Sequence, residues 1–600
     1  MSRSFLLLGV AFSLHCCGGV VTPMSAPFSR DPSGATASAC PSPPSDAAPA
    51  ASAATPAATT APIDAPIDAP IDAPMGTPVP PGSADTFAGV PAGAPALFFT
   101  DLTSGPNSGG EGDLGAFVTL YGENFGAARG SSTVTIGGHE VARYVSWGAD
   151  NALARKLDII VVQLGANVTS GDIVVTVGGC ASNARPFTVR AGDIFFVERG
   201  AANANDSNTG ARDQPWRTLY RRRGQVGPGD IVYVKGGALS TADPRYPGWD
   251  CVLCLFTDND APGTESAPIA YVGYPGDPPV LGAPRPMRRA LFVDGDIDHY
   301  VFANLRMTGY GGTVELRGDG HRIVGNHSYD GVYSNSGSFG IMGDSAHYRI
   351  YGNRIHNNGE RGEKMNGSGF YLQGFGTNSD IDFGWNHIDG QNGSRAIQVY
   401  GHLDGDRVDN VTIHDNLLVG SELNNIVLGG SDGDDDILGT IVVRNNVIIG
   451  AGDPGLRVND PNGTVIIEHN VLMGNGSPGY AGSHAQLLIE RAGAGKVTFR
   501  NNIVYADAGQ SYVTIEAAAG AAALIASHNL FFNAGAAPAW SAASVVADPM
   551  FVAPAALDFR LAAGSPAIDA GAASTGSDFV GIARPQQRAP DIGVHELAAP

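Results

Sequence analysis

Apolar and polar positions repeat along the chain between residues 304 and 529. Each repeat has an apolar pair, an Asn, one or two further apolar residues, a Gly or Asn turn, and a second apolar run. The repeated positions, separated by 22 to 33 residues, are Asn304, Asn326, Asn353, Asn386, Asn416, Asn446, Asn470, Asn502 and Asn529. A period of this length indicates a repeat architecture in which each unit buries its apolar face against its neighbours.

The apolar runs are short and bounded by Gly and Asn, so they predict strands. We expect them to form the coils of a parallel β-helix over residues 193–545, with alternate side chains facing the interior and the outer surface. An inward Asn at each coil corner would bond the backbone of the neighbouring coil and form a ladder. We therefore interpret the repeated Asn residues as scaffold and exclude them from any site.

Residues 95–190 have a different pattern, in which short β-branched runs are separated by Gly, Asn and Asp. Such spacing predicts a small β-sandwich. The runs include Val118-Thr-Leu-Tyr-Gly-Glu-Asn-Phe-Gly126, Val134-Thr-Ile-Gly-Gly138 and Gly171-Asp-Ile-Val-Val-Thr-Val177. With these motifs the segment resembles the IPT/TIG family of immunoglobulin-like domains. The resemblance implies a spacer or carbohydrate-associated module and brings no catalytic residue.

The segment from Asp193 contains Ile194-Phe-Phe-Val197 and Gly227-Pro-Gly-Asp-Ile-Val-Tyr-Val-Lys-Gly236. It resembles the start of secreted right-handed parallel β-helix proteins of the pectate-lyase-like superfamily. The resemblance implies a capping helix, which we expect at 215–225, because an open solenoid end exposes apolar side chains and unpaired backbone.

Residues 546–600 resemble the closing segment of the same proteins. We expect this segment to cap the last coil and fold back along the solenoid, with structural roles for its carboxylates Asp569, Asp591 and Glu596. The predicted fold class is all-β: a right-handed parallel β-helix solenoid preceded by a small immunoglobulin-like β-sandwich.

The N-terminus has one Arg before a short apolar run that ends at Cys16-Cys17. The apolar run is too short to span a membrane, so the profile predicts a signal peptide over residues 1–23. We expect the lipoprotein type, because Leu14 lies three residues before Cys17. Ordinary secretion is the alternative. Residues 24–94 are rich in Pro and Ala and nearly lack aromatic residues, so they predict a disordered linker. We expect a secreted or cell-surface protein, an outer-membrane lipoprotein that meets the membrane only through its N-terminal lipid.

The formal net charge is −22, with 36 Lys and Arg against 58 Asp and Glu. This balance disfavours nucleic acid as a partner. The pair Cys251 and Cys254 forms a CxxC motif without a second pair, which is a poor zinc site. In an oxidising compartment we expect a local disulfide there. Cys180 has no evident partner in the sequence.

A cluster of ionisable residues lies at 357–367 and includes Glu363 and Lys364. Arg395 begins a strand that we expect to stack beside Gly369 on the next coil. Candidate substrate-binding residues around them are Tyr333, Tyr371, Gln373, Gln398, Tyr400 and His402, because aromatic and amide side chains suit sugar faces and hydroxyl groups. The alternative interpretation is a solvated loop with local ion pairs.

The β-helix resemblance implies binding or processing of polysaccharide, since stacked coils make a long groove. A lyase needs a base and a group that neutralises the uronic carboxylate. We assign Lys364 as the base and Arg395 as the neutralising group, with Glu363 as a third catalytic candidate. The Asp cluster of calcium-dependent pectate lyases and the paired Asp of pectin-hydrolysing β-helices are not evident in the sequence.

A second dense feature is an acidic run containing Asp432, Asp434, Asp435 and Asp436. Its carboxylates could bind Ca²⁺, which takes several oxygen ligands; an acidic turn is the alternative. The sequence as a whole predicts an extracellular protein that binds or processes polysaccharide; if the protein is enzymatic, the expected reaction is that of a lyase acting by β-elimination. The second hypothesis is a noncatalytic adhesin or structural surface protein.

Overall fold

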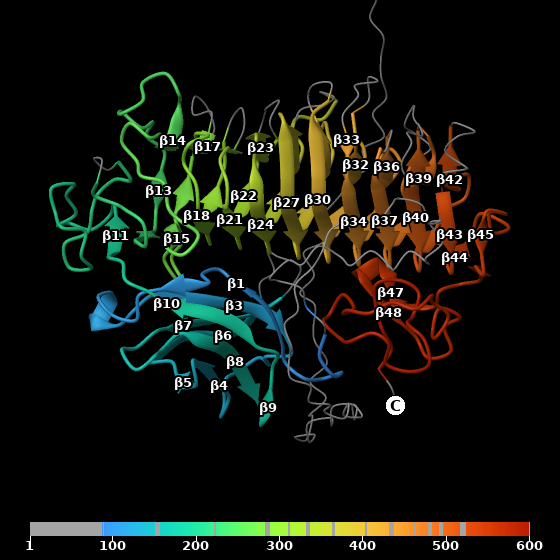
Figure 1. Ribbon diagram of the computed structural model, residues 1–600, viewed down its shortest axis with the longest axis horizontal. Helices are drawn as coiled ribbons and strands as arrows, with labels where there is room; N and C mark the ends of the chain where they lie inside the picture. The colour runs from blue at the N-terminus through green and yellow to red at the C-terminus, as the bar shows by residue number, and fades with distance from the viewer. Residues whose placement is uncertain are drawn as a thin grey trace, which may run out of the picture. The chain divides into compact units, whose positions relative to one another are not determined.

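The protein is described here from a computed structural model (Figure 1). It describes residue 87 and residues 89–150, 157–220, 224–282, 289–309, 313–331, 337–362, 367–401, 405–430, 437–459, 462–477, 483–490, 496–516 and 524–598. The chain divides into the units Met1–Ala39 and Cys40–Pro600, and every described residue belongs to the second. Among those residues, no helix has the length and apolar character needed to cross a membrane.

The first ten strands form two sheets whose pairs are antiparallel, apart from the parallel pair β2–β10. One sheet has the order β1 (Ala96–Thr100), β3 (Phe117–Glu123), β7 (Asp158–Gln163), β6 (Arg143–Asp150). The other has the order β2 (Ser104–Gly105), β10 (Arg185–Val189), β8 (Gly171–Val177), β4 (Thr133–Ile136), β5 (His139–Glu140), with β9 (Cys180–Ala181) paired to β8. This is the predicted sandwich.

The rest of the chain winds through three long parallel sheets (Figure 1). Sheet 1 contains β11 (Ile194–Glu198), β12 (Ile231–Lys235), β15 (Ile269–Gly273), β18 (Tyr300–Ala303), β21 (Arg322–Val324), β24 (Ala346–Tyr351), β27 (Thr377–Gly384), β30 (Arg407–His414), β34 (Thr440–Arg444), β37 (Thr464–Glu468), β40 (Lys496–Arg500), β43 (Leu524–Ser527) and β45 (Ser541–Ala542), with β33 (Ile437–Leu438) paired to β30.

Sheet 2 contains β13 (Ala238–Leu239), β16 (Val280–Leu281), β19 (Arg306–Met307), β22 (His327–Tyr329), β25 (Arg354–His356), β28 (His387–Asp389), β31 (Leu417–Val419), β35 (Val447–Ile449), β38 (Val471–Met473), β41 (Ile503–Tyr505), β44 (Leu530–Phe532) and β46 (Val545–Val546). Sheet 3 contains β14 (Cys251–Leu255), β17 (Arg289–Val293), β20 (Val314–Leu316), β23 (Phe339–Gly343), β26 (Phe370–Gly374), β29 (Ile397–Gly401), β32 (Ile426–Leu428), β36 (Leu456–Val458), β39 (Ala485–Ile489) and β42 (Ser511–Ile515). Successive coils add one strand to each sheet, which is the predicted right-handed parallel β-helix.

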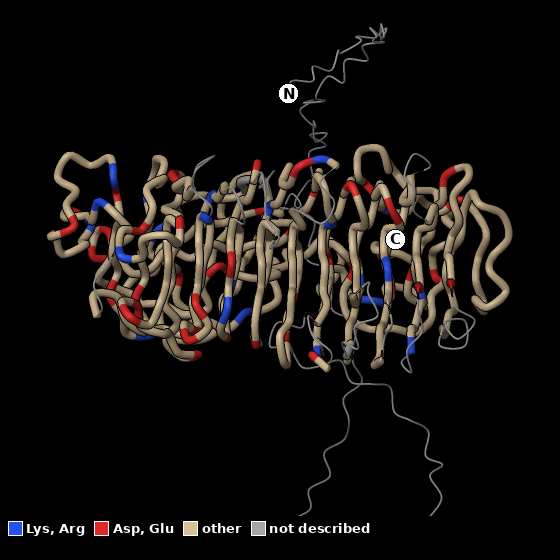
Figure 2. The backbone as a smooth tube through the Cα atoms, turned by 90° about the horizontal axis from the view of Figure 1, so that it is seen from above, with Lys and Arg blue, Asp and Glu red and all other residues tan. Residues whose placement is uncertain are grey.

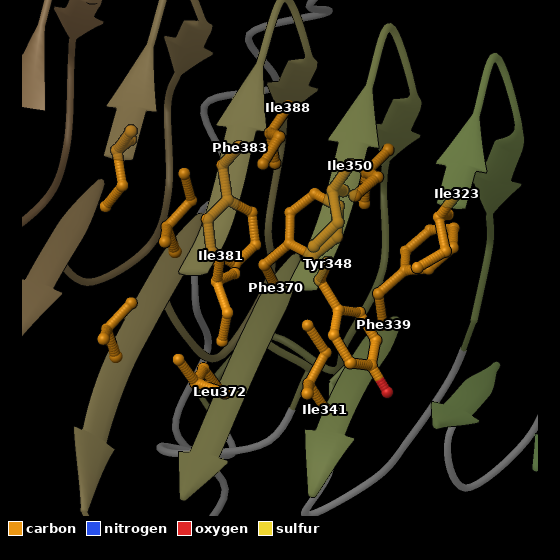
Figure 3. Packing of buried hydrophobic residues seen from close by; sticks show 14 of the residues in the cluster. Ile323, Phe339, Ile341, Tyr348, Ile350, Phe370, Leu372, Ile381, Phe383 and Ile388 are labelled. Atoms are coloured by element: carbon orange, nitrogen blue, oxygen red, sulfur yellow. The ribbon is translucent and has the colours of Figure 1, made fainter. Parts of the chain in front are cut away.

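Inward side chains stack from coil to coil and fill the solenoid. Figure 3 shows Phe339 and Phe370 on neighbouring strands of sheet 3, facing Phe383 from sheet 1. The ring centroids lie 5.2 Å apart for Phe339–Phe370 and 5.0 Å apart for Phe370–Phe383. All three side chains are buried. The alternation of inward and outward positions along each strand therefore decides which residues remain available for a ligand.

The predicted Asn ladder runs through the coil corners from Asn326 to Asn529. Each Asn is almost fully buried, and each from Asn326 to Asn502 donates from Nδ2 to Oδ1 of the Asn on the next coil, at 2.9 to 3.1 Å. Asn529 ends the ladder and donates to Ser541 Oγ at 3.1 Å. The same Oδ1 accepts the backbone N–H of the preceding Asn, as between Asn353 and Asn386 at 3.0 Å. The ladder satisfies buried polar groups at the turns and confirms the structural role of these residues.

Asn304 corrects the predicted register by one residue. It adopts a left-handed φ of +55°, the corner conformation that Gly325 and Asn445 take immediately before a ladder Asn. Leu305 occupies the ladder position, and its backbone N–H donates to Oδ1 of Asn326 at 3.0 Å. Asn304 instead donates to Asp101 of the sandwich at 2.8 Å. Asn is common at both corner positions because it tolerates left-handed backbone, so the sequence does not distinguish them.

The solenoid start differs from the prediction, because the described part of 215–225 contains no helix. Trp216 pairs with Val197 through a parallel bridge, and its ring stacks on Phe195 with centroids 4.6 Å apart. Trp216 is only 2% exposed, so a bulky ring covers this end instead of a helix. In the described residues, helical structure is limited to the 3-10 turns η1 (Glu111–Asp113) and η2 (Pro554–Ala556).

The C-terminal segment folds back on sheet 2, as predicted. It includes the hairpin of β47 (Phe551–Ala553) and β48 (Asp558–Leu561), and its Ile592 belongs to the same buried cluster as Leu417 and Ile503 of sheet 2. Glu596 forms a buried ion pair with Arg584 at 2.8 Å. The carboxylates of Asp569 and Asp591 accept backbone N–H groups of this segment, so all three carboxylates are structural.

The sandwich and sheet 1 share a buried cluster of aromatic rings. Phe98 stacks on Trp385 with ring centroids 5.5 Å apart, and the Trp385 ring lies edge-on to His414. Val90, which the sequence places in the disordered linker, is buried and pairs with Ile582. Ordered structure therefore begins before residue 95, because the end of the linker contacts the C-terminal segment.

His414 is buried on sheet 1 between two carboxylates. Its Nε2 lies 2.9 Å from Asp382 Oδ1, and its Nδ1 lies 2.7 Å from Asp415 Oδ2. Burial lowers the pKa of His414, but the two carboxylates outweigh burial and raise the pKa to about 9. The imidazolium is therefore part of a buried ion triplet beneath the aromatic cluster.

Cys251 and Cys254 form the predicted local disulfide, with Cα atoms 5.8 Å apart. Cys180 is disulfide-bonded as well. The sequence does not predict the second bond, because nothing in the local spacing points to a partner.

Candidate functional site

The outer face of sheet 3 carries a row of side chains in register on successive coils. Following the strand pairs, the row reads Cys254, Phe292, Glu315, Gly340, Tyr371, Gln398, Val427, Arg457 and Leu488. A parallel row contains Met342, Gln373 and Tyr400. Sheet 3 therefore brings four of the predicted substrate-binding residues together on two adjacent strands, β26 and β29.

Tyr371 and Tyr400 form the aromatic part of this face. Their hydroxyl groups share a hydrogen bond of 2.5 Å, and their rings meet edge to face with centroids 5.7 Å apart. Both residues are partly exposed, whereas Gln373 and Gln398 are each 8% exposed. Burial raises the pKa of Tyr371, so its phenol is protonated and available as a hydrogen-bond donor at neutral pH.

Arg395 lies just before β29, next to Gly369 as the sequence predicts. The Gly369 N–H donates to the Arg395 carbonyl oxygen at 2.9 Å, which fixes its backbone between the two coils. The residue is 7% exposed, and Nη1 donates to Oε1 of Gln398 at 2.8 Å. Its buried Nε has no hydrogen-bond partner among the described residues. A buried guanidinium with an unused donor is costly, and an anion would relieve that cost.

A second arginine on the face was missed by the sequence analysis. Arg457 extends the outer row on β36 and donates from Nε to Oε2 of Glu490 at 2.7 Å. Burial lowers the pKa of Arg395, the charge of Arg457 lowers it further, and Asp453 acts in the opposite direction. The signal for Arg457 was its outward position in Gly455-Leu-Arg-Val458, two coils beyond Arg395.

Several predicted site residues lie outside the described residues. They are Lys364, Glu363, Tyr333, His402, Asp432, Asp434, Asp435 and Asp436. The assignments of Lys364 and Glu363 as catalytic residues, of Tyr333 and His402 as substrate contacts, and of the four Asp residues as calcium ligands therefore stay predictions. Across the described ranges, no group of three or more His, Cys, Asp or Glu side chains is arranged to hold a metal ion.

A cavity of about 180 Å³ lies away from this face, lined by residues of the sandwich and the solenoid that include Asp101, Tyr121 and Asn304. Burial raises the pKa of Asp101 to about 6. Its carboxylate accepts bonds from the backbone of Leu102 and Thr119 and from Asn304. Because these polar groups already bond one another, we do not take the cavity as the site.

No protein-family model matches the sequence. No curated protein matches it either. Similar solved structures include pectate lyase Pel9A, with 15% identity, a TM-score of 0.35 and coverage of 67% of this chain and 96% of that chain. A rhamnogalacturonan lyase has 16% identity and a TM-score of 0.34, covering 60% of this chain and 90% of that chain. The complex of XylC with xylose has 11% identity and a TM-score of 0.38, covering 67% and 98%.

The fold assignment rests on the strand pairing of this chain itself: three parallel sheets that gain one strand per coil. That pairing defines a right-handed parallel β-helix, and the function has to be argued from the outer face of sheet 3.

Proposed function

We propose that the outer face of sheet 3 binds an extended uronic-acid polysaccharide and that Arg395 binds one of its carboxylates. The observation that carries this proposal is the Arg395 guanidinium, which is 7% exposed and has a buried Nε without a partner among the described residues. A carboxylate accepts two hydrogen bonds from a guanidinium at once, which suits this donor set. Arg457, in an ion pair with Glu490, lies on the same face.

The neighbouring side chains suit the rest of a sugar residue. The phenol groups of Tyr371 and Tyr400 offer donors and acceptors to hydroxyl groups, and their rings offer apolar area. Acidic and basic positions are mixed along the coils in Figure 2. Recognition of a polyanion by a chain of net charge −22 requires a local cation, and Arg395 is the one assigned here.

The proposed reaction is β-elimination. Lys364 removes the proton from the carbon next to the uronate carboxylate, and the C–H electrons form a carbon–carbon double bond. The glycosidic C–O bond breaks on the adjacent carbon, and the departing oxygen keeps its electron pair and takes up a proton from water. Arg395 stabilises the negative charge that develops on the carboxylate, and Glu363 is the third catalytic candidate.

The described residues on either side of segment 363–366 support this assignment. Gly362 donates its N–H to Glu422, which also accepts the N–H of Gly393 at 2.6 Å. Ser368 shares a hydrogen bond of 2.8 Å with Ser394, the residue before Arg395. Gly362 and Gly393 thus share the acceptor Glu422, and Ser368 bonds directly to the residue before Arg395.

The remaining parts of the proposal concern the rest of the chain. The sandwich is assigned to the IPT/TIG family from its motifs, as a spacer. The N-terminal segment is assigned as a lipoprotein signal and linker that hold the protein at the outside of the cell. Calcium binding by Asp432, Asp434, Asp435 and Asp436 is a further part of the proposal.

The test is a screen against uronic-acid polysaccharides and neutral ones, read at the ultraviolet absorbance of unsaturated products. We expect product from a uronate and none from neutral polymers, and we expect Lys364→Ala to abolish it. Activity that survives Lys364→Ala removes Lys364 as the base. Binding of a uronate without product would instead support the noncatalytic adhesin.

A further inference from the structure

An aromatic cluster covers the N-terminal part of sheet 3. The rings of Tyr246, Trp249, Phe256 and Phe292 lie next to one another, with centroid distances of 4.5 to 5.2 Å between contacting pairs. Phe292 is fully buried, but Trp249 is 40% exposed. The cluster therefore presents a large part of the Trp249 indole surface to solvent.

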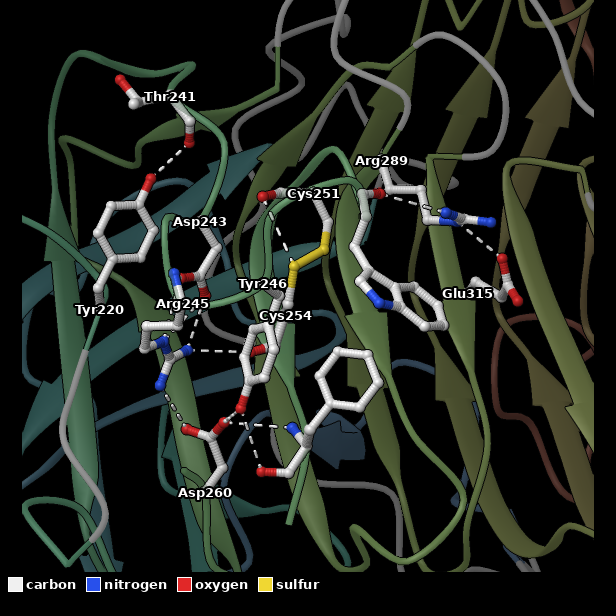
Figure 4. Close-up of a disulfide and its surroundings, with 12 residues drawn as sticks. Tyr220, Thr241, Asp243, Arg245, Tyr246, Cys251, Cys254, Asp260, Arg289 and Glu315 are labelled. Carbon is white, nitrogen blue, oxygen red and sulfur yellow. Dashed lines mark hydrogen bonds and ion pairs between the residues drawn. A yellow bond between two sulfur atoms is a disulfide. The ribbon is translucent and has the colours of Figure 1, made fainter. Parts of the chain in front are cut away.

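The loop that carries Trp249 is held from both sides (Figure 4). Arg245 forms ion pairs with Asp243 at 2.8 Å and Asp260 at 3.1 Å, and it donates to the Cys254 carbonyl oxygen at 2.9 Å. The Cys251–Cys254 disulfide begins two residues after Trp249. Arg289 donates to the Trp249 carbonyl oxygen at 3.4 Å. These interactions hold the backbone of the loop, and ring contacts with Phe256 and Phe292 hold the indole. Such pre-organisation lowers the entropy cost of binding.

The exposed indole lies over the same outer row that contains Tyr371. Trp249 contacts Phe292, and strand pairing leads from Phe292 through Glu315 and Gly340 to Tyr371. Three steps at the usual strand spacing amount to about 14 Å. Along this path Glu315 is buried in an ion pair with Arg289 at 2.8 Å, and Gly340 has no side chain. Neither residue projects a free charged group into the path.

We propose that Trp249 is a stacking subsite for a sugar ring of the same polysaccharide chain whose carboxylate binds Arg395. The apolar face of a pyranose ring suits a flat indole surface, and stacking adds affinity without requiring a charge. This inference rests on the proposed function, because Arg395 supplies the second attachment point.

The separation of the two attachment points makes binding depend on chain length. A monosaccharide or disaccharide is too short to touch both Trp249 and Arg395, whereas a longer chain reaches both. Two linked contacts bind more tightly than either alone, because the second contact forms within the complex. The polymer should therefore bind more tightly than its disaccharide, and the difference should depend on Trp249.

The test uses the full chain and measures the affinity of polygalacturonate, alginate and hyaluronate, each as polymer and as its disaccharide unit. We expect Trp249→Ala to weaken polymer binding roughly fivefold, the size of one aromatic contact. Disaccharide binding should be unchanged, and Trp249→Tyr should recover most of the loss. The matched control is Ile525→Ala, which removes another exposed apolar side chain (55% exposed) from sheet 1 and should change nothing.

The outcomes separate this inference from the proposed function. Equal polymer binding by Trp249→Ala and the wild type overturns the Trp249 subsite alone. Polymer binding that is lost in Trp249→Ala but unchanged in Arg395→Gln keeps the stacking subsite and overturns the carboxylate site. Binding of none of the polymers overturns both. Self-association that disappears in Trp249→Ala, without any effect on polymer binding, assigns the indole to contact with a second copy and overturns the subsite.

Discussion

The Asn ladder makes a quantitative prediction at Asn416, near the middle of the solenoid. Its Oδ1 accepts the backbone N–H and the Nδ2 of Asn386, each at 2.9 Å. Its Nδ2 donates to the Phe383 carbonyl oxygen at 3.0 Å and to Asn446 Oδ1 at 2.9 Å. Asn416→Ala therefore leaves the Asn386 N–H and the Phe383 carbonyl oxygen buried without side-chain partners.

Each orphaned buried group costs about 1–3 kcal/mol, so Asn416→Ala should lower the free energy of unfolding by about 2 to 6 kcal/mol. The measurement is guanidinium chloride unfolding followed by far-ultraviolet circular dichroism. Asn203→Ala is the matched control, because the exposed side chain of Asn203 donates one bond, to the Asp213 carbonyl oxygen at 2.7 Å. That variant should lose less than about 1 kcal/mol.

Equal losses in Asn416→Ala and Asn203→Ala would refute the idea that the ladder holds the coils together. Asn416→Leu separates hydrogen bonding from packing, since Leu fills the volume without restoring the bonds. We expect it to be as unstable as the Ala variant. Recovery to wild-type stability would show that volume, rather than hydrogen bonding, is what the corner needs.

Three further predictions concern other parts of the chain. The raised pKa of His414, about 9, stabilises the fold fully below pH 6.5, and this contribution is lost as pH rises through 9; melting temperatures should fall over that window in the wild type and stay flat in His414→Gln. Ile592→Ala, at a fully buried contact with sheet 2, should cost about 2–5 kcal/mol and expose the C-terminal segment to limited proteolysis, whereas Val552→Ala (50% exposed) should not. Tyr371→Phe should weaken uronate binding roughly fivefold through loss of one hydrogen bond, measured by calorimetry, and unchanged affinity would remove Tyr371 from the site.

Periodicity was sufficient to predict the fold, because every coil has to bury apolar side chains and to satisfy the buried backbone at its corner. An inward Asn and flanking apolar pairs recur wherever a corner has to satisfy buried backbone, so the ladder from Asn326 to Asn529 was readable from the sequence. The error at Asn304 has a local cause, since Asn suits both the left-handed corner and the ladder position. The start of the solenoid was predicted less well, because a single ring, Trp216, covers the end and leaves no periodic pattern.

The candidate site was only partly predictable. Register placed Arg395 beside Gly369, because strand pairing follows from the repeat. Tyr371 and Gln398 were predicted to line one groove, and the strand pairing makes them direct neighbours. Arg457 and Trp249 were missed, since their roles depend on which outward positions line one face across several coils. The burial of His414 under rings from the sandwich depends on contacts between residues far apart in sequence. No local sequence pattern predicts such contacts.

The central claim is that Arg395 on sheet 3 recognises a uronate carboxylate. The direct measurement is calorimetric titration of the wild type and Arg395→Gln with a uronic-acid polysaccharide and with the same polymer after reduction of its carboxylates to alcohols. A charge-assisted hydrogen bond corresponds to about tenfold or more in affinity, so the wild type should bind the acidic polymer at least about tenfold more tightly than the reduced one. Arg395→Gln should bind both polymers equally weakly. Equal binding of the two polymers by the wild type would contradict the account.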